Sequence, residues 1–245
     1  MKAMVLAAGL GTRLRPLTDS RPKALVEVGG RTLLEITLTR LKQFGVREAI
    51  VNVHHFADMV VEYLRARDNF GMKLAISRED NQLLDTGGGL KKAAWFFEKD
   101  DEPFFLHNVD VVSTINLARM AEVHAASGAI ATLAVMERDS SRLLLFDEGG
   151  ALCGRRGEVR PTEPERPGEV AYVSLAFCGI HVISPRLLGE IRETGAFSII
   201  DVYLRLAEKG QKIQGFRADD EYWRDLGKPQ SVAAAERDLA AGKFQ

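Results

Sequence analysis

Cysteine is scarce in this chain, which has two cysteines among its 245 residues, Cys153 and Cys178, and no CxxC spacing. A disulfide framework or a structural zinc site requires several cysteines at suitable spacing, so the sequence argues against both. We expect the two thiols to be buried side chains without a chemical role.

An excess of charge of either sign is also missing. Lysine and arginine number 33, aspartate and glutamate number 34, and the formal net charge is -1 at pH 7. No global basic field is therefore available to hold nucleic acid or an anionic membrane, and any anion site must be local. No apolar run approaches the length that spans a bilayer, and no basic segment with an apolar core opens the chain. We expect a soluble, cytoplasmic protein.

The first part of the chain alternates between strand and helix patterns. Short apolar runs are followed by segments with apolar residues at helical spacing, which predicts a mostly parallel sheet covered by helices on both faces. The expected strands are residues 2–8, 48–55, 72–79 and 103–112, and the expected helices are residues 32–44, 57–67 and the segment after Gly87 to Gly89.

After about residue 142 the pattern changes to shorter strands and turns. Residues 143–159 are typical of a hairpin, residues 161–169 form a Pro-rich charged loop, and residues 171–184 return to strand character. Helices are expected after Pro185, Ser198 and Lys228. We therefore expect one α/β domain over residues 1–245, a Rossmann-like three-layer α/β/α fold with a mixed, mostly parallel sheet and a small β-rich insertion.

The loop GLGTRLRPLT after the first strand resembles a phosphate-binding loop but matches neither of two well-known ones. A Walker A loop needs a lysine directly after its second glycine, and here Gly11 is followed by Thr12 and Arg13. A dinucleotide fingerprint needs a third small residue where this chain has Leu14, which argues against a dinucleotide-dependent oxidoreductase.

The residues of this loop nevertheless suit a triphosphate. We expect Gly9 and Gly11 to adopt positive φ and to allow backbone amides to approach phosphate oxygens. Arg13 supplies a bidentate donor fork, and Lys23, expected to be exposed on the loop, supplies a point charge. A solvated basic loop is the alternative for an isolated pair of glycines, but the whole pattern up to Pro22 and Lys23 favours phosphate binding.

The stretch from Gly9 to Lys23 resembles the signature of the sugar-1-phosphate nucleotidylyltransferases, and the resemblance extends over essentially the whole chain. It implies that Arg13 binds the outer phosphates of a nucleoside triphosphate and that Lys23 lies near the reacting α-phosphate. It also divides the domain into a nucleotide-binding half, about residues 1–140, and a sugar-phosphate-binding half, about residues 141–245. The nucleotide-binding residues that it implies are Ala7, Ala8, Gly9, Gly11, Thr12, Arg13, Lys23, Asp85, Thr86, Gly87 and Gly88.

Two aspartates are candidates for a magnesium site. Asp110 follows a buried strand at the end where ligands of open α/β sheets collect, although a helix cap or turn is an alternative role. Asp225 lies in YWRDLGKPQSV, which resembles a metal-binding WxDxGTP segment of the family. The resemblance implies that both carboxylates bind Mg²⁺, and that Asp110 acts with Arg13 and Lys23 in catalysis. Lys228 and Val109 depart from the family pattern, but neither change removes a ligand.

The turn DNQLLDTGGG, residues 80–89, corresponds in position to a turn that reads the base in the family, so the resemblance implies that role here. Gly87 is expected to begin a helix whose first amides donate, with a tight entry into the helix as the alternative role. The sugar-phosphate residues implied by the resemblance are Asn108, Gly179, Ile180 and Asp225. Arg155 and Arg156 are further candidates for the acceptor's phosphate or for an acidic lactyl group, with a solvated hairpin as the alternative. A Glu-Lys-Pro triplet that many glucose-1-phosphate enzymes of the family carry is missing.

The family resemblance implies a Mg²⁺-dependent enzyme that makes a nucleotide sugar and pyrophosphate from an NTP and a sugar 1-phosphate. UTP with N-acetylmuramate 1-phosphate, a cell-wall sugar, is the first hypothesis. GTP with mannose or heptose 1-phosphate, cytidylyl transfer to a phosphocholine-type acceptor, and a catalytically silent nucleotide-sugar-binding subunit are alternatives. The acceptor phosphate is already an anionic nucleophile, so no general base is needed, and the five histidines are expected to be packing or surface residues. The sequence does not distinguish a monomer from a homodimer.

Overall fold

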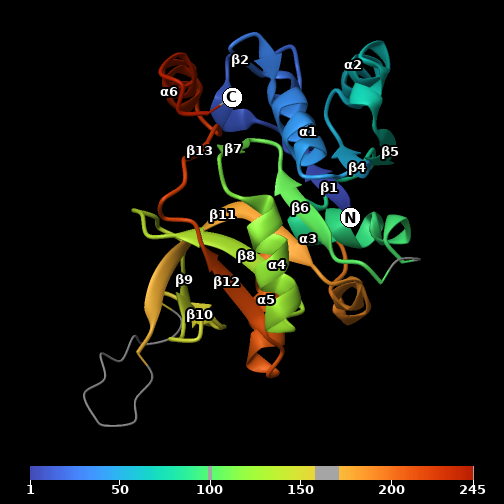
Figure 1. Cartoon of the computed structure of the whole chain (residues 1–245). Helices are drawn as coiled ribbons and strands as arrows, with labels where there is room; N and C mark the ends of the chain where they lie inside the picture. The colour runs from blue at the N-terminus through green and yellow to red at the C-terminus, as the bar shows by residue number, and fades with distance from the viewer. Residues whose placement is uncertain (99–100, 158–170, 245) are drawn as a thin grey trace.

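In the computed structural model, residues 1–98, 101–157 and 171–244 are described. Four parallel strands form one half of the central sheet in the order β5-β4-β1-β6 (Figure 1). Strands β1, β4 and β6 are short runs of mainly buried residues, as expected for a sheet covered on both faces, whereas the edge strand β5 is mostly half-buried. The four strands are β1 (Lys2–Leu6), β4 (Glu48–Val53), β5 (Lys73–Arg78) and β6 (Phe104–Asn108).

The long strand β11 (Val173–Ile183) joins the two halves of the sheet. It runs antiparallel to β6 on one side and pairs along its length with two strands of the second half, antiparallel to both. The expected hairpin is present and extends the same sheet, whereas the Pro-rich loop at residues 161–169 lies outside the described residues. The remaining strands of this half are β8 (Ala131–Met136), β9 (Leu143–Phe146), β10 (Leu152–Arg155) and β12 (Ile213–Arg217).

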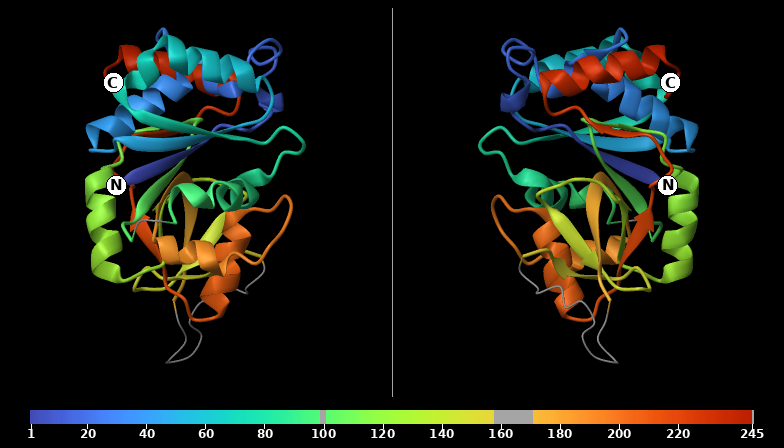
Figure 2. Two further views of the ribbon diagram at one scale, coloured as in Figure 1. Left: turned by 90° about the vertical axis from the view of Figure 1, so that its right-hand side faces the viewer. Right: turned by 90° about the vertical axis from the view of Figure 1, so that its left-hand side faces the viewer.

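Helices cover both faces of this sheet, which confirms the predicted α/β class (Figure 2). Successive side chains of a strand point to opposite faces, so Ala3 and Val5 belong to one buried apolar cluster and Met4 belongs to another. The first cluster includes side chains of α1 (Leu33–Gln43), α2 (Ala57–Ala66), α4 (Leu117–Ser127) and α6 (Pro229–Ala240). The second includes side chains of α3 (Asp85–Lys92) and α5 (Ile199–Glu208).

The strand expected at residues 103–112 is divided into two. β6 ends at Asn108, the chain turns at Asp110, and β7 (Val111–Ser113) pairs with β13 (Trp223–Asp225) outside the central sheet. A smaller ladder joins β2 (Glu27–Val28) to β3 (Arg31–Thr32). The helix after Pro185 is a 3-10 helix, Pro185–Glu190. Within the described ranges, no helix is both long and apolar enough to cross a membrane.

Candidate active site

The loop after β1 folds around the carbonyl of Gly11. Gly11 has a φ of +65°, and its oxygen accepts hydrogen bonds from Leu14 N at 2.8 Å and from Thr18 Oγ1 at 2.8 Å. A positive φ was expected at Gly9 as well, but Gly9 does not adopt it, and a Cβ there would meet no atom within 4 Å. The glycine requirement at Gly11 is therefore conformational, whereas the missing side chain at Gly9 leaves open space.

A cavity of about 310 Å³, here called the nucleotide-side cavity, opens beside this loop. It brings together eight of the predicted site residues from five separate segments of the chain. Its lining is Leu6, Ala8, Gly9, Arg13, Lys23, Asn52, Leu83, Asp85, Thr86, Asn108, Val109 and Asp110.

The backbone N–H groups of three predicted nucleotide-binding residues already donate hydrogen bonds to other residues of the protein. Ala7 N donates to Asn52 Oδ1 at 2.7 Å, and the amides of Gly87 and Gly88 both donate to Phe197 O, at 2.9 and 3.4 Å. The expectation that Gly87 begins the helix is wrong, because α3 starts at Asp85 and contains Gly87 to Gly89. These amides are therefore not available to read a base in this structure.

The glycines of α3 serve close packing. A Cβ on Gly87 would lie 2.4 Å from the ring of Phe197, and a Cβ on Gly88 would lie 2.4 Å from the carbonyl oxygen of Gly195. Thr86 Oγ1 also accepts from Ile199 N at 3.0 Å. The nucleotide half is thereby joined to the segment that leads into α5.

A buried polar pair, Asn52 and Glu79, which the sequence reasoning missed, supports the wall of the nucleotide-side cavity. Asn52 is 2% exposed and donates through Nδ2 to Glu79 Oε1 at 2.7 Å, while Glu79 is 1% exposed and accepts from Leu84 N through Oε2 at 2.9 Å. Together with the Ala7 N–H bond, this chain of contacts ties the loop after β1 to the turn before α3. A polar residue inside the apolar strand β4 was the available signal.

The backbones of the two predicted metal-binding aspartates lie close together, with Asp225 in β13 and Asp110 in the turn directly before β7. Asp225 is opposite Val111 in the β13–β7 ladder, and Leu226 N donates to Asp110 O at 2.8 Å. Asp225 Oδ1 accepts from Gly227 N at 2.7 Å, and a Cβ on Gly227 would lie 2.9 Å from Arg13 Nη2 and 2.6 Å from Asp225 Oδ1. Arg13 and Asp225 therefore meet at Gly227.

The side chain of Lys23 extends to Asp110, one of these two aspartates. Its Nζ donates to Asp110 Oδ2, and the two side chains are 13% and 11% exposed. The expectation that Lys23 is an exposed loop lysine is therefore wrong: the short 3-10 helix Lys23–Leu25 turns it inward against Asp110. The described residues contain no group of three or more His, Cys, Asp or Glu side chains placed to hold a metal.

A second cavity of about 520 Å³, here called the acceptor-side cavity, lies next to Asp225. Asn108 lines both cavities, so the two meet at the end of β6. Among the predicted sugar-phosphate residues, Asn108, Gly179 and Asp225 line it. Gly179 has a φ of +78°, and a Cβ there would lie 2.9 Å from Asn108 Nδ2. Ile180 points away, into the core at 0% exposure, which leaves only its backbone for a ligand.

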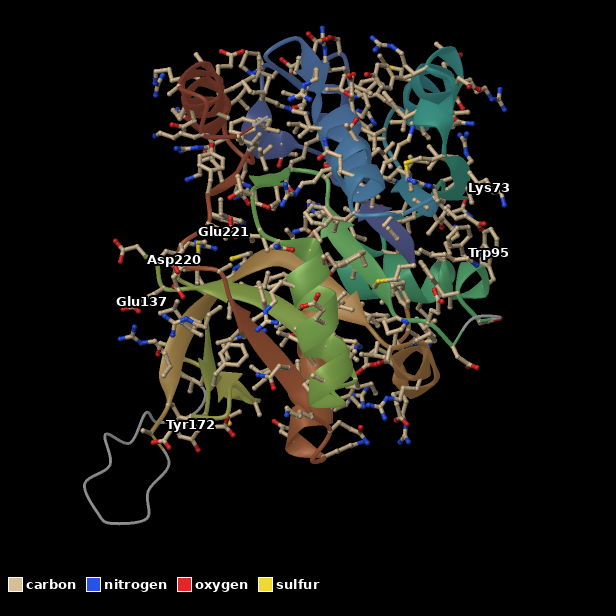
Figure 3. All side chains as sticks on the ribbon, viewed as in Figure 1. Lys73, Trp95, Glu137, Tyr172, Asp220 and Glu221 are labelled. Atoms are coloured by element: carbon tan, nitrogen blue, oxygen red, sulfur yellow. The ribbon has the colours of Figure 1, made fainter. Side chains whose placement is uncertain are left out.

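Three arginines line the acceptor-side cavity: Arg138, Arg142 and Arg155. Arg138 lies 4.1 Å from the centre of the Trp223 ring and donates to Phe177 O at 2.9 Å. The segment that carries Arg138 and Arg142 follows Glu137, which is labelled in Figure 3. Of the two arginines predicted from the sequence, Arg155 faces the cavity and Arg156 does not. The sequence reasoning missed Arg138 and Arg142, which belong to no recognisable motif, and gave no role to Trp223, the first residue of the WxDxGTP-like segment.

Three histidines are buried and take no part in either cavity. Burial lowers the pKa of His107 to about 4, that of His124 to about 4 and that of His181 to about 3, so all three are neutral near pH 7. Cys178 is buried, and burial raises its thiol pKa to about 12. Cys153, also expected to be buried, is only partly so.

Residues 2–242 match the family model described as nucleotidyl transferase. The chain is similar to the N-acetylmuramate alpha-1-phosphate uridylyltransferase of Caulobacter vibrioides, with 38% identity over 97% of this chain and 96% of that protein. It is also similar to the mannose-1-phosphate guanylyltransferase catalytic subunit beta of Danio rerio, with 30% identity over 94% of this chain and 62% of that protein. UDP-glucose pyrophosphorylase, solved with UDP-glucose, is similar in fold, with a TM-score of 0.78 over 98% of each chain at 17% identity.

Proposed function

The chain belongs to the sugar-1-phosphate nucleotidylyltransferase family, and from this premise we propose that it transfers the uridylyl group of UTP to N-acetylmuramate 1-phosphate and releases pyrophosphate. The observation that carries the choice of substrates is the 38% identity, over nearly the full length of both chains, to the Caulobacter vibrioides relative of that activity. The product is a nucleotide-activated cell-wall sugar. A cytoplasmic location stays a prediction from the sequence.

In this proposal the nucleotide-side cavity holds the triphosphate. Arg13 binds the outer phosphates through its planar donor fork, and Lys23 leaves Asp110 to follow the α-phosphate. The open space at Gly9 allows phosphate oxygens to approach the backbone. Asp85 and Thr86, at the start of α3, face the base. Residues 1–140 supply this half of a single domain, and residues 141–245 supply the acceptor half.

Members of this family generally use a divalent metal ion, and the residues present fit one. Asp110 lines the nucleotide-side cavity and Asp225 lies opposite Val111, the residue that follows Asp110, and Mg²⁺ prefers one or two carboxylates completed by phosphate oxygens and water. We propose that these two aspartates hold Mg²⁺, which neutralises the developing negative charge of the triphosphate when it is bound.

The chemistry that remains for the protein is positioning and charge stabilisation. A phosphate oxygen of the acceptor forms a bond to the α-phosphorus of UTP while the bond to the β-phosphate oxygen breaks, and pyrophosphate leaves. The position of Asn108 on both cavities supports a path between the two substrates. No proton needs to be removed from the nucleophile, which agrees with the neutral, buried state of the histidines.

Guanylyl transfer to mannose 1-phosphate is the second candidate, because the relative from Danio rerio is 30% identical to this chain. Glucose-specific transfer is disfavoured, because this chain lacks the Glu-Lys-Pro triplet that many glucose-1-phosphate enzymes of the family carry. A catalytically silent binding subunit is disfavoured, because Arg13, Lys23, Asp110 and Asp225 are all present and lie together.

The deciding experiment measures pyrophosphate release from UTP, GTP, CTP, ATP and dTTP against N-acetylmuramate, mannose, heptose, glucose and N-acetylglucosamine 1-phosphates, with Mg²⁺. The proposal expects the highest kcat/KM for UTP with N-acetylmuramate 1-phosphate. A maximum for GTP with mannose or heptose 1-phosphate would replace it. Tight nucleotide binding without turnover of any pair would support the silent subunit.

A further inference from the structure

Two of the three arginines of the acceptor-side cavity belong to one hairpin: Arg155 lies in β10, and Arg142 directly precedes β9. Arg155 in β10 is opposite Leu144 in β9, and Arg142 precedes Leu144 by two residues. Side chains two residues apart on a strand, and directly opposite across an antiparallel pair, share one face of the sheet. Arg142, Leu144 and Arg155 all line the cavity, which places the two arginines on the wall that the hairpin forms.

Arg138, rather than this arginine pair, packs beside the predicted metal site. Asp225 and Trp223 are two residues apart on β13, both line the cavity, and Arg138 packs on the Trp223 ring. The phosphate of an acceptor that reacts beside Asp225 is therefore placed at the Arg138 end. Arg142 and Arg155, which belong to the β9–β10 hairpin, remain for another part of the acceptor.

The cavity wall at the arginine pair already receives a carboxylate. Arg155 Nη2 donates to Asp201 Oδ1 at 2.8 Å, and Asp201, from the first turn of α5, lines the same cavity. The Asp201 side chain is 58% exposed, so this ion pair exchanges readily with another anion. Two planar guanidinium groups on one wall match the geometry of a bound carboxylate.

We infer that Arg142 and Arg155 form a carboxylate clamp that selects sugar 1-phosphates bearing a second, carboxylic acid group. The inference rests on the proposed function for the phosphate end of the acceptor. N-acetylmuramate 1-phosphate carries such a group in its lactyl ether, whereas mannose, heptose and N-acetylglucosamine 1-phosphates do not. The clamp therefore acts on specificity and leaves the transfer step to the residues around Asp110.

The test compares acceptors that differ in the carboxylate. With UTP, kcat and KM are measured for N-acetylmuramate 1-phosphate and N-acetylglucosamine 1-phosphate, and for glucuronate 1-phosphate and glucose 1-phosphate. The enzymes are the wild type, Arg142→Gln, Arg155→Gln and the matched control Arg156→Gln, whose side chain does not line the cavity. Thermal unfolding of each variant checks that it folds.

The clamp predicts that Arg142→Gln and Arg155→Gln each lower kcat/KM about ten- to hundredfold for the carboxylated acceptors, mainly through KM. The neutral acceptors should change less than about threefold, and Arg156→Gln should leave every value near that of the wild type. An equal loss for carboxylated and neutral acceptors would overturn the clamp, because the arginines would then act on the shared phosphate.

The two proposals fail in different ways. If the wild type uses N-acetylmuramate 1-phosphate but the arginine variants lose none of its selectivity, the clamp is wrong and the proposed function stands. If the wild type prefers glucuronate to glucose 1-phosphate, loses that preference in the variants and does not use N-acetylmuramate 1-phosphate, the clamp stands and the proposed acceptor is wrong. Turnover of neutral acceptors alone would overturn both.

Discussion

Lys23 Nζ donates a hydrogen bond to Asp110 Oδ2 across 87 positions of sequence, and both side chains are nearly buried. Each residue is also a proposed ligand for a different reactant, Lys23 for the α-phosphate and Asp110 for the metal. The free protein thus keeps the two charges paired with one another until substrate and metal bind. Binding then exchanges one ion pair for two separate charge contacts, and no unpaired charge is left in the site.

Replacing Lys23 should therefore affect folding as well as catalysis. In Lys23→Ala the Asp110 carboxylate stays nearly buried without its cation, which should lower the free energy of unfolding by about 1–3 kcal/mol. Turnover should fall at least about a hundredfold, because the α-phosphate loses a charge contact. Urea unfolding and pyrophosphate release measure the two effects. Lys228→Ala, at an exposed lysine, is the control, and a Lys23→Ala protein as stable as the control would contradict the pairing.

Asp225 offers a cleaner test of the metal site, because its carboxylate forms no ion pair within the part of the chain that the structure describes and accepts a hydrogen bond from Gly227 N. Asp225→Asn keeps an oxygen that accepts the Gly227 N–H bond but removes the negative charge. We expect a fold stability within about 0.5 kcal/mol of the wild type and a loss of turnover of at least about a hundredfold. A titration of activity with Mg²⁺ should require a higher concentration. Unchanged Mg²⁺ dependence would remove Asp225 from the proposed metal site.

A substitution at Gly9 should change the affinity for the nucleotide without weakening the fold. Because a Cβ at Gly9 meets no protein atom and the backbone is not left-handed, Gly9→Ala should leave stability unchanged or raise it by about 0.4–1 kcal/mol. The methyl group enters the nucleotide-side cavity, so the Kd for UTP should rise about tenfold or more. Calorimetric titration checks the affinity. Gly189→Ala, where the surroundings are equally open, is the matched control, and equal affinities in the two variants would argue against close phosphate approach at Gly9.

The sequence predicted the alternation of strands and helices because buried strands and amphipathic helices have distinct apolar periods. It also proposed Asp110 and Asp225 as a pair, since each lies in a segment that resembles a family motif, and the pairing of β13 with β7 brings their backbones close together. Motifs of this kind record contacts to a shared substrate, so they are visible in one chain without any knowledge of packing.

Residues that act through packing were not predictable in the same way. The role of Gly87 depends on the Phe197 ring and the inward position of Lys23 depends on Asp110, both of which are distant in sequence. Arg138 and Arg142 carry no motif, and their place on a cavity wall follows from the register of β9 and the position of Trp223. Tertiary contacts decide such roles, and local pattern does not encode them.

The buried histidines predict a loss of stability in mild acid. Their pKa values of about 4, 4 and 3 in the folded protein lie below the unfolded value of about 6.5, so the unfolded chain binds more protons between these limits. Stability is thus complete above about pH 6.5 and falls as the pH drops toward 4, by about 1.4 kcal/mol per pH unit for each histidine. Urea midpoints between pH 7.5 and 4.5 measure this. In His124→Gln the slope should decrease by about a third, and an unchanged slope would contradict a neutral, buried His124.

The contact between Asn52 and Glu79 can be tested by reversing its polarity. In Glu79→Gln an amide replaces one of two oxygens that accept from Asn52 Nδ2 and Leu84 N, so two donors face each other in a buried place. This should lower the free energy of unfolding by about 1–3 kcal/mol and raise the KM for UTP, because the turn before α3 loses its support.

Adding Asn52→Asp to the Glu79→Gln variant should restore much of the lost free energy of unfolding and bring the KM for UTP back toward that of the wild type. The new carboxylate still accepts the Ala7 N–H bond through one oxygen, and its other oxygen accepts from the new amide, whose own oxygen is free to accept from Leu84 N. Unfolding free energies and UTP kinetics of the two single variants and the double variant give the coupling between the sites. If the stability losses of the two single variants simply add in the double variant, the two side chains act independently. The pair would then not hold the loop after β1 to the turn before α3.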